Sequence, residues 1–165
     1  MKVVIAISVL YLAAIGYGEN LTPGKSVFGE KHFTEYIPGD LPLIIAAPHD
    51  GRLRPGEIPD RSRGVTTADA RTQDLARLIA TKIHERTGRH LHLIICHLHR
   101  SKLDANREIG EAAQGNALAE QAWKEHHAFI ETACEAAVRQ FGVAFFIDLH
   151  GHAHSDSRVE LGYLY

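Results

Sequence analysis

Residues 41–51 read LPLIIAAPHDG, so an apolar run of strand length ends directly in a polar segment that contains His49. Residues 143–152 read VAFFIDLHGH and have the same form, with His150 at the end of the apolar run. A third apolar run occupies residues 91–98. Continuous apolar runs of this length are typical of strands that are buried on both faces of a parallel sheet.

The segments between these runs indicate helices. Residues 66–87 carry apolar side chains at three- and four-residue steps and end before Gly88, and residues 117–140 form a second helical segment. Residues 52–64 predict a long loop, and residues 19–40 an irregular lead-in rich in Gly, Pro and charge. The order of strands and helices predicts an α/β fold, a three-layer sandwich with a mainly parallel sheet.

The composition excludes several classes of protein. The chain has 165 residues, 45% of them apolar and 23% charged, which fits one soluble domain and excludes a disordered or polytopic membrane protein. A formal net charge of -2 gives no basic field for nucleic acid, so we expect no nucleic-acid partner. Histidine is the outlier, with 12 copies, and histidine is the commonest metal ligand in proteins.

The N-terminus has the pattern of a secretory signal peptide. Lys2 gives a positive start, residues 3–15 are almost wholly apolar, and small residues precede Glu19. We therefore expect residues 1–18 to be removed and residues 19–165 to be secreted as a single domain with no membrane partner. The alternative is that the apolar start is an N-terminal hydrophobic strand or a membrane anchor. An oxidising compartment would permit a bridge between the cysteines at 96 and 134, although their spacing does not predict one.

Two histidines at the ends of parallel strands predict a metal site. Ligands bind beyond the carboxyl ends of such strands, and catalytic zinc takes three protein ligands and a water. His49 and His150 are the first two candidates, and the third is Asp69 or Glu57. Asp50 and Asp60 are weaker candidates for the same role. Asp69 has a competing interpretation, since it follows Thr66 by three residues in a near capping-box arrangement.

The remaining histidines offer one rival site. If the chain stays extended after residue 149, His150, His152 and His154 share one face and form a three-histidine site, although Gly151 favours a turn. We interpret His97 and His99 as strand-end residues, and the pair His126-His127 as surface residues of the second helix.

Residues 103–107 read LDANR and carry a candidate substrate-binding pair. The guanidinium of Arg107 beside the amide of Asn106 suits bidentate binding of a carboxylate, and a surface Arg with a turn Asn is the simpler alternative. Asp148 precedes His150 by two residues, so it is a candidate to orient that ring or to pair with an Arg.

These segments resemble the N-formylglutamate amidohydrolase family, relatives of the zinc carboxypeptidases and aspartoacylases. The matching pieces occur in the family's order and cover most of the chain from Leu43 onward. They are Ala47-Pro48-His49-Asp50-Gly51, Asp69-x-x-Thr72-x-x-Leu75, Leu103-Asp104-Ala105-Asn106-Arg107, Asp148-Leu149-His150-Gly151-His152 and Glu160-Leu161-Gly162.

The resemblance implies a phosphorylase/hydrolase-like fold and one Zn²⁺ per chain, with hydrolysis of an amide in an N-formyl or N-acyl amino acid. It implies that His49, Asp69 and His150 hold the zinc and that Asn106 and Arg107 hold the carboxylate of a small-molecule substrate. Glutamate is absent three residues after His49, where Arg52 stands, so Asp69 is assigned by its position before the helix.

The general base is the least defined part of this prediction. In the related carboxypeptidases a catalytic glutamate follows the last histidine ligand, and Glu160 is the only glutamate here after His150. Because only a short apolar tail follows, we expect the domain to lack its C-terminal part. The alternative function is a non-catalytic, secreted, histidine-rich metal-binding protein or an inactive remnant of the family.

Overall fold

The computed structural model describes residues 2–5, 21–152 and 159–163, and it is an α/β structure built on one mixed sheet. Within these residues the strand order is β2-β3-β5-β4-β6-β1-β7. The strands are β1 (Lys2–Ile5), β2 (Val27–Phe28), β3 (Thr34–Ile37), β4 (Leu43–Ala47), β5 (His92–Cys96), β6 (Phe145–Leu149) and β7 (Glu160–Tyr163). The helices are α1 (Thr72–Thr87), α2 (Ile109–Ala112) and α3 (Ala117–Phe141).

The three strands predicted from the apolar runs form the parallel centre of the sheet. β4 pairs in parallel with both β5 and β6, with Ile45 opposite Leu93 on one side and Ile147 on the other. The outer pairs are mostly antiparallel, because β3 runs against β5, β2 against β3 and β1 against β6. The sheet as a whole is therefore mixed, and parallel pairing dominates only at its centre.

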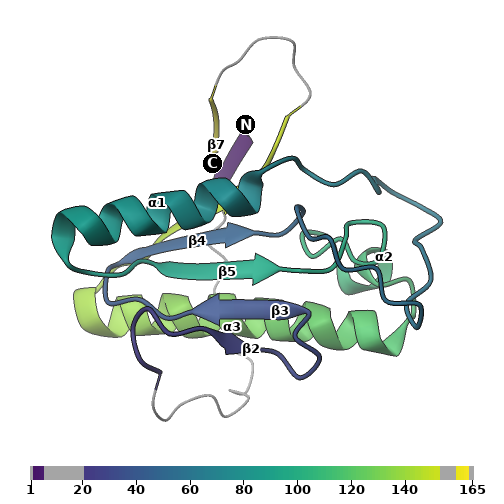
Figure 1. Cartoon of the computed structure of the whole chain (residues 1–165), viewed down its shortest axis with the longest axis horizontal. Helices are drawn as coiled ribbons and strands as arrows, with labels where there is room; N and C mark the ends of the chain where they lie inside the picture. The colour runs from purple at the N-terminus through teal and green to yellow at the C-terminus, as the bar shows by residue number, and fades with distance from the viewer. Residues whose placement is uncertain (1, 6–20, 153–158, 164–165) are drawn as a thin grey trace.

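One helix covers each face of the central strands (Figure 1). Successive side chains of a strand point to opposite faces. Ile45 of β4 accordingly packs in the cluster that contains Ala76 of α1, and Ile44 packs in the cluster that contains Phe129 of α3. Burial on both faces explains why β4 is a continuous apolar run.

The lead-in predicted as irregular contains β2 and β3, so that part of the prediction was wrong. β3 reads TEYI, a short stretch with two polar residues, and the signal of a strand is weak at that length. Tertiary pairing with β5 fixes it, with Tyr36 opposite Ile94. Residues 38–42 then reverse the chain between β3 and β4 and leave room for β5 between them.

Helix α1 begins later than the apolar pattern predicts, at Thr72 instead of residue 66. Arg71 has a φ of 62°, a left-handed conformation that a right-handed helix cannot include. Its C-terminal end agrees with the sequence, because Gly88 takes the left-handed conformation of a helix cap with a φ of 69°. Residues 66–71 therefore form a loop at the edge of the site described below.

Helix α3 buries a stripe of small and aromatic side chains at three- and four-residue steps, and His126 belongs to it. The stripe consists of Ala119, Ala122, His126, Phe129, Ala133 and Ala137. The prediction that the pair of histidines is at the surface was wrong for His126, which is 2% exposed. Burial lowers the pKa of His126 to about 3. His127 is half-buried and its Nε2 lies 3.0 Å from the carbonyl oxygen of Ala105.

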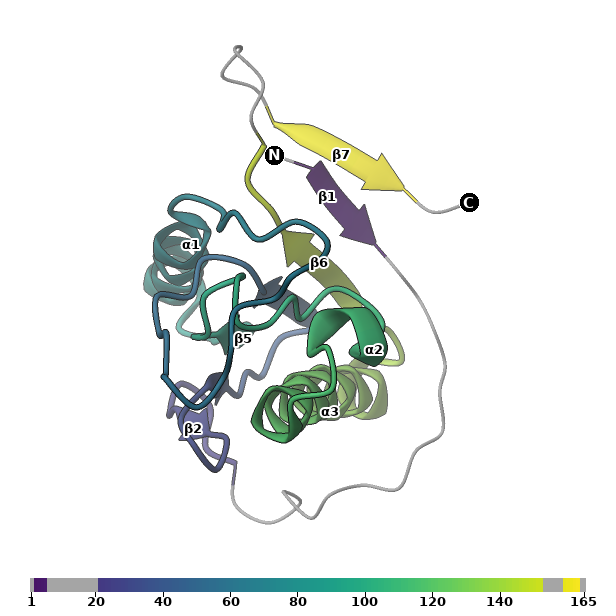
Figure 2. The ribbon, with the colours of Figure 1, turned by 90° about the vertical axis from the view of Figure 1, so that its right-hand side faces the viewer.

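The ends of the described chain meet at one side of the sheet. Figure 2 shows β1 and β7 next to each other beyond β6. Residues 2–5 of the predicted signal peptide form β1, and the rest of it, residues 1 and 6–18, lies outside the described residues. Among the helices described, none has the length and the apolar composition needed to cross a bilayer. The cysteines at 96 and 134 are both free thiols.

Candidate metal centre

The candidate centre lies at the carboxyl ends of two neighbouring parallel strands. His49 follows β4 and His150 directly follows β6, and these strands pair side by side. The sequence predicted this meeting point, since parallel strands end at the same edge of a sheet. His49 is 1% exposed, and the side chain of His150 is 13% exposed. One ligand candidate is therefore buried and the other borders the surface.

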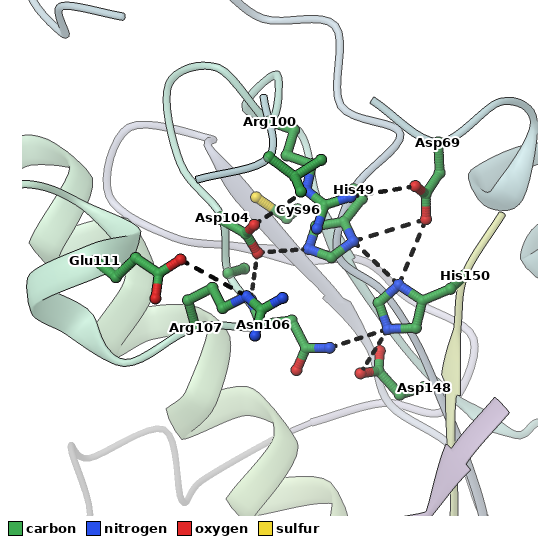
Figure 3. Close-up of polar contacts among 12 residues, drawn as sticks. His49, Asp69, Cys96, Arg100, Asp104, Asn106, Arg107, Glu111, Asp148 and His150 are labelled. Atoms are coloured by element: carbon green, nitrogen blue, oxygen red, sulfur yellow. Dashed lines mark hydrogen bonds and ion pairs between the residues drawn. The ribbon is translucent and has the colours of Figure 1, made fainter. Parts of the chain in front are cut away.

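Three candidate ligand atoms converge at this point (Figure 3). His49 Nδ1 and His150 Nδ1 are 3.0 Å apart, and Asp69 Oδ2 lies 3.6 Å from the first and 3.4 Å from the second. Zinc ligands at about 2.0–2.1 Å in a tetrahedron are roughly 3.3 Å from one another. The three separations scatter around that value, so the residues fit a tetrahedral ion with one position left over. Among the described residues, this is the set of three or more ligating side chains close enough to hold a metal.

Asp69 is held toward the two histidines by the loop before α1. The backbone N–H of Asp69 donates to the carbonyl of His49 at 3.0 Å, and the N–H of Gly151 donates to Asp69 Oδ2 at 2.9 Å. Asp69 precedes the first helical residue, so the capping-box interpretation is wrong. Asp50 takes that role instead, since its Oδ2 accepts the N–H of Gln73 at 3.1 Å.

The second nitrogen of each histidine meets an aspartate. His49 Nε2 lies 2.7 Å from Asp104 Oδ1, and His150 Nε2 lies 2.9 Å from Asp148 Oδ2. A carboxylate at Nε2 fixes the proton on that nitrogen and leaves the Nδ1 lone pair for a metal. A metal at the shared point would require this tautomer in both rings, with no proton on either Nδ1. The contact of Asp148 agrees with one of the two roles expected from the sequence, whereas no role was expected for Asp104.

Two arginines support the aspartates. Arg100 Nε donates to Asp104 Oδ2 at 3.0 Å, and its NH1 lies 3.5 Å from Asp69 Oδ1. The buried Arg61 places its NH1 3.7 Å from Asp104 Oδ2. Sequence analysis did not single out either arginine, because their roles depend on the paths of two loops. Arg100 connects the ligand carboxylate to the carboxylate that orients His49.

The pKa values show how strongly these groups interact. Burial would raise the pKa of Asp69, but hydrogen bonds with His150, His49 and the Gly151 N–H outweigh it and hold this pKa well below its usual range. Burial would likewise raise the pKa of Asp104, and the hydrogen bond and charge of His49 reverse that effect.

His150 shifts in the opposite direction. Burial lowers its pKa, but the hydrogen bonds and charges of Asp148 and Asp69 outweigh burial and raise it to about 9. The surrounding carboxylates therefore favour positive charge at this ring, and a metal ion bound at Nδ1 would have to replace the proton there.

The two residues proposed to bind the substrate, Asn106 and Arg107, have different neighbours. The side-chain amide of Asn106 lies 3.0 Å from His150 Nε2 and therefore borders the centre. Arg107 is exposed, and its Nε lies 3.9 Å from Glu111 Oε1. Its backbone carbonyl accepts a hydrogen bond from the indole of Trp123 at 2.8 Å, so α3 fixes the loop that carries both residues.

The other carboxylate candidates bind elsewhere. Glu57 is exposed, and Asp60 accepts a hydrogen bond from Ser101 Oγ at 2.8 Å and pairs with Lys102 at 3.1 Å. Together with the capping role of Asp50, these contacts leave Asp69 as the carboxylate that meets both histidines.

The other histidine candidates are also separate from the centre. His97 Nε2 lies 2.9 Å from Glu35 Oε2, and His99 contacts Ser101. Of the three-histidine site after β6, His150 is the member in the centre, and His154 lies outside the described residues.

Glu160, the candidate base, begins β7, where its backbone pairs with Lys2 of β1. Its side chain lies outside what the structure describes. Comparison of the chain with models of known protein families, with curated proteins and with solved structures finds no match.

Proposed function

We propose that the protein is a zinc-dependent hydrolase of the amide bond in N-formyl or N-acyl amino acids or similar small carboxylate-bearing amides. One observation carries the proposal: two histidine nitrogens and one carboxylate oxygen lie 3.0–3.6 Å from one another at the ends of parallel strands. This donor set is that of catalytic zinc sites, which keep a fourth position for water.

The chain's own residues would hold and orient the ion. His49, Asp69 and His150 would be the ligands, and Asp104 and Asp148 would keep each imidazole in the tautomer that offers Nδ1. Bound zinc supplies a water of lowered pKa, toward ~7, and polarises a substrate carbonyl. Asn106, next to His150, would contact the substrate, and Arg107 on the same loop is the first candidate to bind its carboxylate.

The resemblance to the N-formylglutamate amidohydrolase family extends the proposal to the remaining parts of the molecule. In this scheme the sheet with a helix on each face is a phosphorylase/hydrolase-like sandwich, Glu160 is the general base, and the protein is secreted after loss of residues 1–18. Each of these points is separable from metal binding, because the three ligands lie within the central sheet and its adjoining loops.

The test begins with metal content. The full chain is purified, incubated with zinc, freed of excess metal and analysed for zinc by mass spectrometry. We expect one zinc per chain, and less than a tenth of that in His49→Ala and His150→Ala. His84→Ala is the matched control, because His84 is an exposed histidine of α1. Equal zinc in the control and in the two ligand variants would refute the proposed centre.

Hydrolysis is measured separately. The zinc-loaded protein is incubated with a panel of N-formyl and N-acetyl amino acids, and release of the free amine is followed. Turnover that is lost in His150→Ala supports the hydrolase. Stoichiometric zinc without turnover of any panel member supports the alternative, a metal-binding protein without catalytic activity.

A further inference from the structure

A polar hollow of about 650 Å³ lies next to the loop that carries Asp69. Its lining includes Arg54, Arg61, Thr66, Thr67 and His99. These residues come from the long loop before α1 and from the turn after β5. The hollow is therefore built from the same two loops that deliver Asp69 and Arg100 to the centre.

The hollow and the centre share structural elements. Ala68 also lines the hollow and directly precedes Asp69 in the chain. The Cα atoms of adjacent residues are ~3.8 Å apart, so this wall of the hollow adjoins a proposed ligand. Asp104 connects the two sites in a second way. One of its carboxylate oxygens contacts His49 at 2.7 Å, and the other lies 3.7 Å from Arg61.

Arg61 contributes a buried positive charge to the wall of the hollow, and Asp104, 3.7 Å from its NH1, balances part of that charge. The residue is 6% exposed, and its NH1 donates to the carbonyls of Val65 at 2.8 Å and Arg100 at 3.1 Å. Its NH2 is buried and has no hydrogen-bond partner within the described part of the chain. A buried guanidinium with a donor left over makes the surrounding potential favourable for an anion.

Arg54 adds a second, accessible charge. It is exposed, and its NH2 lies 2.7 Å from Nε2 of His99, whose Nδ1 lies 3.1 Å from Ser101 Oγ. Ser101 Oγ in turn donates to Asp60 at 2.8 Å. This chain of contacts holds Arg54 at the hollow with part of its guanidinium still available. Asp60, the acidic residue of the lining, is already paired with Lys102, so the arginines dominate the charge.

We propose that this hollow is a carboxylate-binding subsite, with Arg54 and the hydroxyls of Thr66 and Thr67 as donors. The assignment of its ligand to the substrate rests on the proposed hydrolase function. Planar guanidinium groups bind carboxylates through two parallel hydrogen bonds, and threonine hydroxyls complete such sites. The subsite takes the place of the Asn106-Arg107 pair as the binding position of the carboxylate, because the arginine of that pair has Glu111 as its neighbour.

The probe is N-acetylglycine, and its uncharged amide is the matched ligand without a carboxylate. Binding to the full chain is measured by titration of its ¹⁵N amide signals, after zinc has been removed with a chelator. We expect the acid to bind at least about tenfold more tightly than the amide, with the largest shifts at Thr66 and Thr67. Arg54→Gln should remove about that tenfold preference, a loss typical of one charge-assisted contact.

Three further variants discriminate between sites. Arg63→Gln removes an exposed arginine of the same loop that is absent from the lining, and it should leave the preference unchanged. The double variant Thr66→Val/Thr67→Val should weaken binding of the acid without altering that of the amide. A preference that survives in Arg54→Gln but disappears in Arg107→Gln would overturn the subsite and place the carboxylate beside Asn106.

Equal binding of acid and amide, or no binding of either, would also overturn the subsite. Because zinc is absent throughout, the titration does not depend on the metal centre. If zinc does not bind but the acid binds more tightly than the amide, the subsite is retained and the zinc-dependent hydrolase is refuted. If zinc binds but the acid and the amide bind equally, the subsite is refuted and the hydrolase is retained.

Discussion

At the residue scale, each histidine of the centre has both of its nitrogens committed. Nδ1 of His49 and of His150 faces the shared point, and Nε2 of each ring faces an aspartate. A ring held at both ends has one orientation, so each Nδ1 points to the shared point without rotation of the ring, and a metal would replace the proton there. The aspartates are therefore as much a part of the proposed site as the ligands.

This predicts that Asp104→Asn weakens zinc binding about 10–100-fold, the usual cost of losing a carboxylate that orients a ligand histidine. In this variant the new side-chain amide has two orientations. One places its NH₂ group against the N–H of His49, and the other offers that N–H a neutral oxygen in place of a charged one. Affinity is measured by competition with a chelating dye. Asp60→Asn is the control, since Asp60 pairs with Lys102 and Ser101 away from the centre. Equal affinities of the two variants would contradict the role of Asp104.

A second residue-scale prediction concerns acid stability. His92 is 2% exposed, and its Nδ1 accepts hydrogen bonds from the hydroxyl of Tyr36 at 2.8 Å and the N–H of Gly39 at 3.1 Å. Burial lowers the pKa of His92 from 6.5 to about 4, although the charge of Asp40 opposes this. Between pH 6.5 and pH 4, His92 is therefore protonated in the unfolded chain but neutral in the folded chain. The free energy of unfolding falls as the pH falls through that range.

The expected contribution of His92 is a loss of about 2 kcal/mol in the free energy of unfolding between pH 7 and pH 5. Urea unfolding at the two pH values measures it for the parent and for His92→Gln, which does not titrate. The variant should lose less stability on acidification than the parent by about that amount. The same loss in both proteins would show that His92 is not the responsible group.

The sequence alone predicted the candidate ligands but not the residues that surround them. His49 and His150 could be found because each follows a long apolar strand, and Asp148 because it is two residues from a ligand. Asp104 and Arg100 could not, because the loop after β5 brings them back under His49 only through its folded path. His126 was misplaced although its spacing from Ala122 and Phe129 already put it on the buried stripe of α3.

At the element scale, the predictable elements are those buried on both faces. β4, β5 and β6 are continuous apolar runs because helices cover the sheet on both sides, and the first two of them are buried along almost their whole length. β3 is equally well buried, yet two of its four residues are polar. Thr34 donates a hydrogen bond to the buried carboxylate of Glu125, and Glu35 forms an ion pair with Arg77. Specific partners, not periodicity, fix that strand.

Helix α3 yields the prediction at this scale. Phe129 is fully buried between the helix and the sheet, where it contacts Tyr36 with ring centroids 5.4 Å apart. Phe129→Ala should cost about 3–5 kcal/mol in the free energy of unfolding, because it leaves a cavity that the rigid sheet cannot fill. Val138→Ala, at a 51% exposed position of the same helix, should cost less than about 0.5 kcal/mol. Urea unfolding compares the two, and similar costs would show that α3 does not pack as described.

At the scale of the whole molecule, the proposed ligands come from distant parts of the chain. His49 follows β4, Asp69 precedes α1 and His150 follows β6. The first proposed ligand is therefore 101 positions from the last. An ion at this point would connect the centre of the sheet to the loop that leads into α1. A metal that binds only the folded chain stabilises it, because unfolding separates the ligands.

Zinc at about 100 times its dissociation constant should therefore add about 2.7 kcal/mol to the free energy of unfolding. For a chain of this size, that corresponds to a rise in Tm of roughly 5–10 °C. Differential scanning fluorimetry measures it with zinc and with a chelator in excess. His150→Ala should show the same Tm in both conditions, whereas His84→Ala should keep the full rise. A rise that persists in His150→Ala would mean that zinc stabilises the protein from another site, and the assignment of the sheet-edge centre would fail.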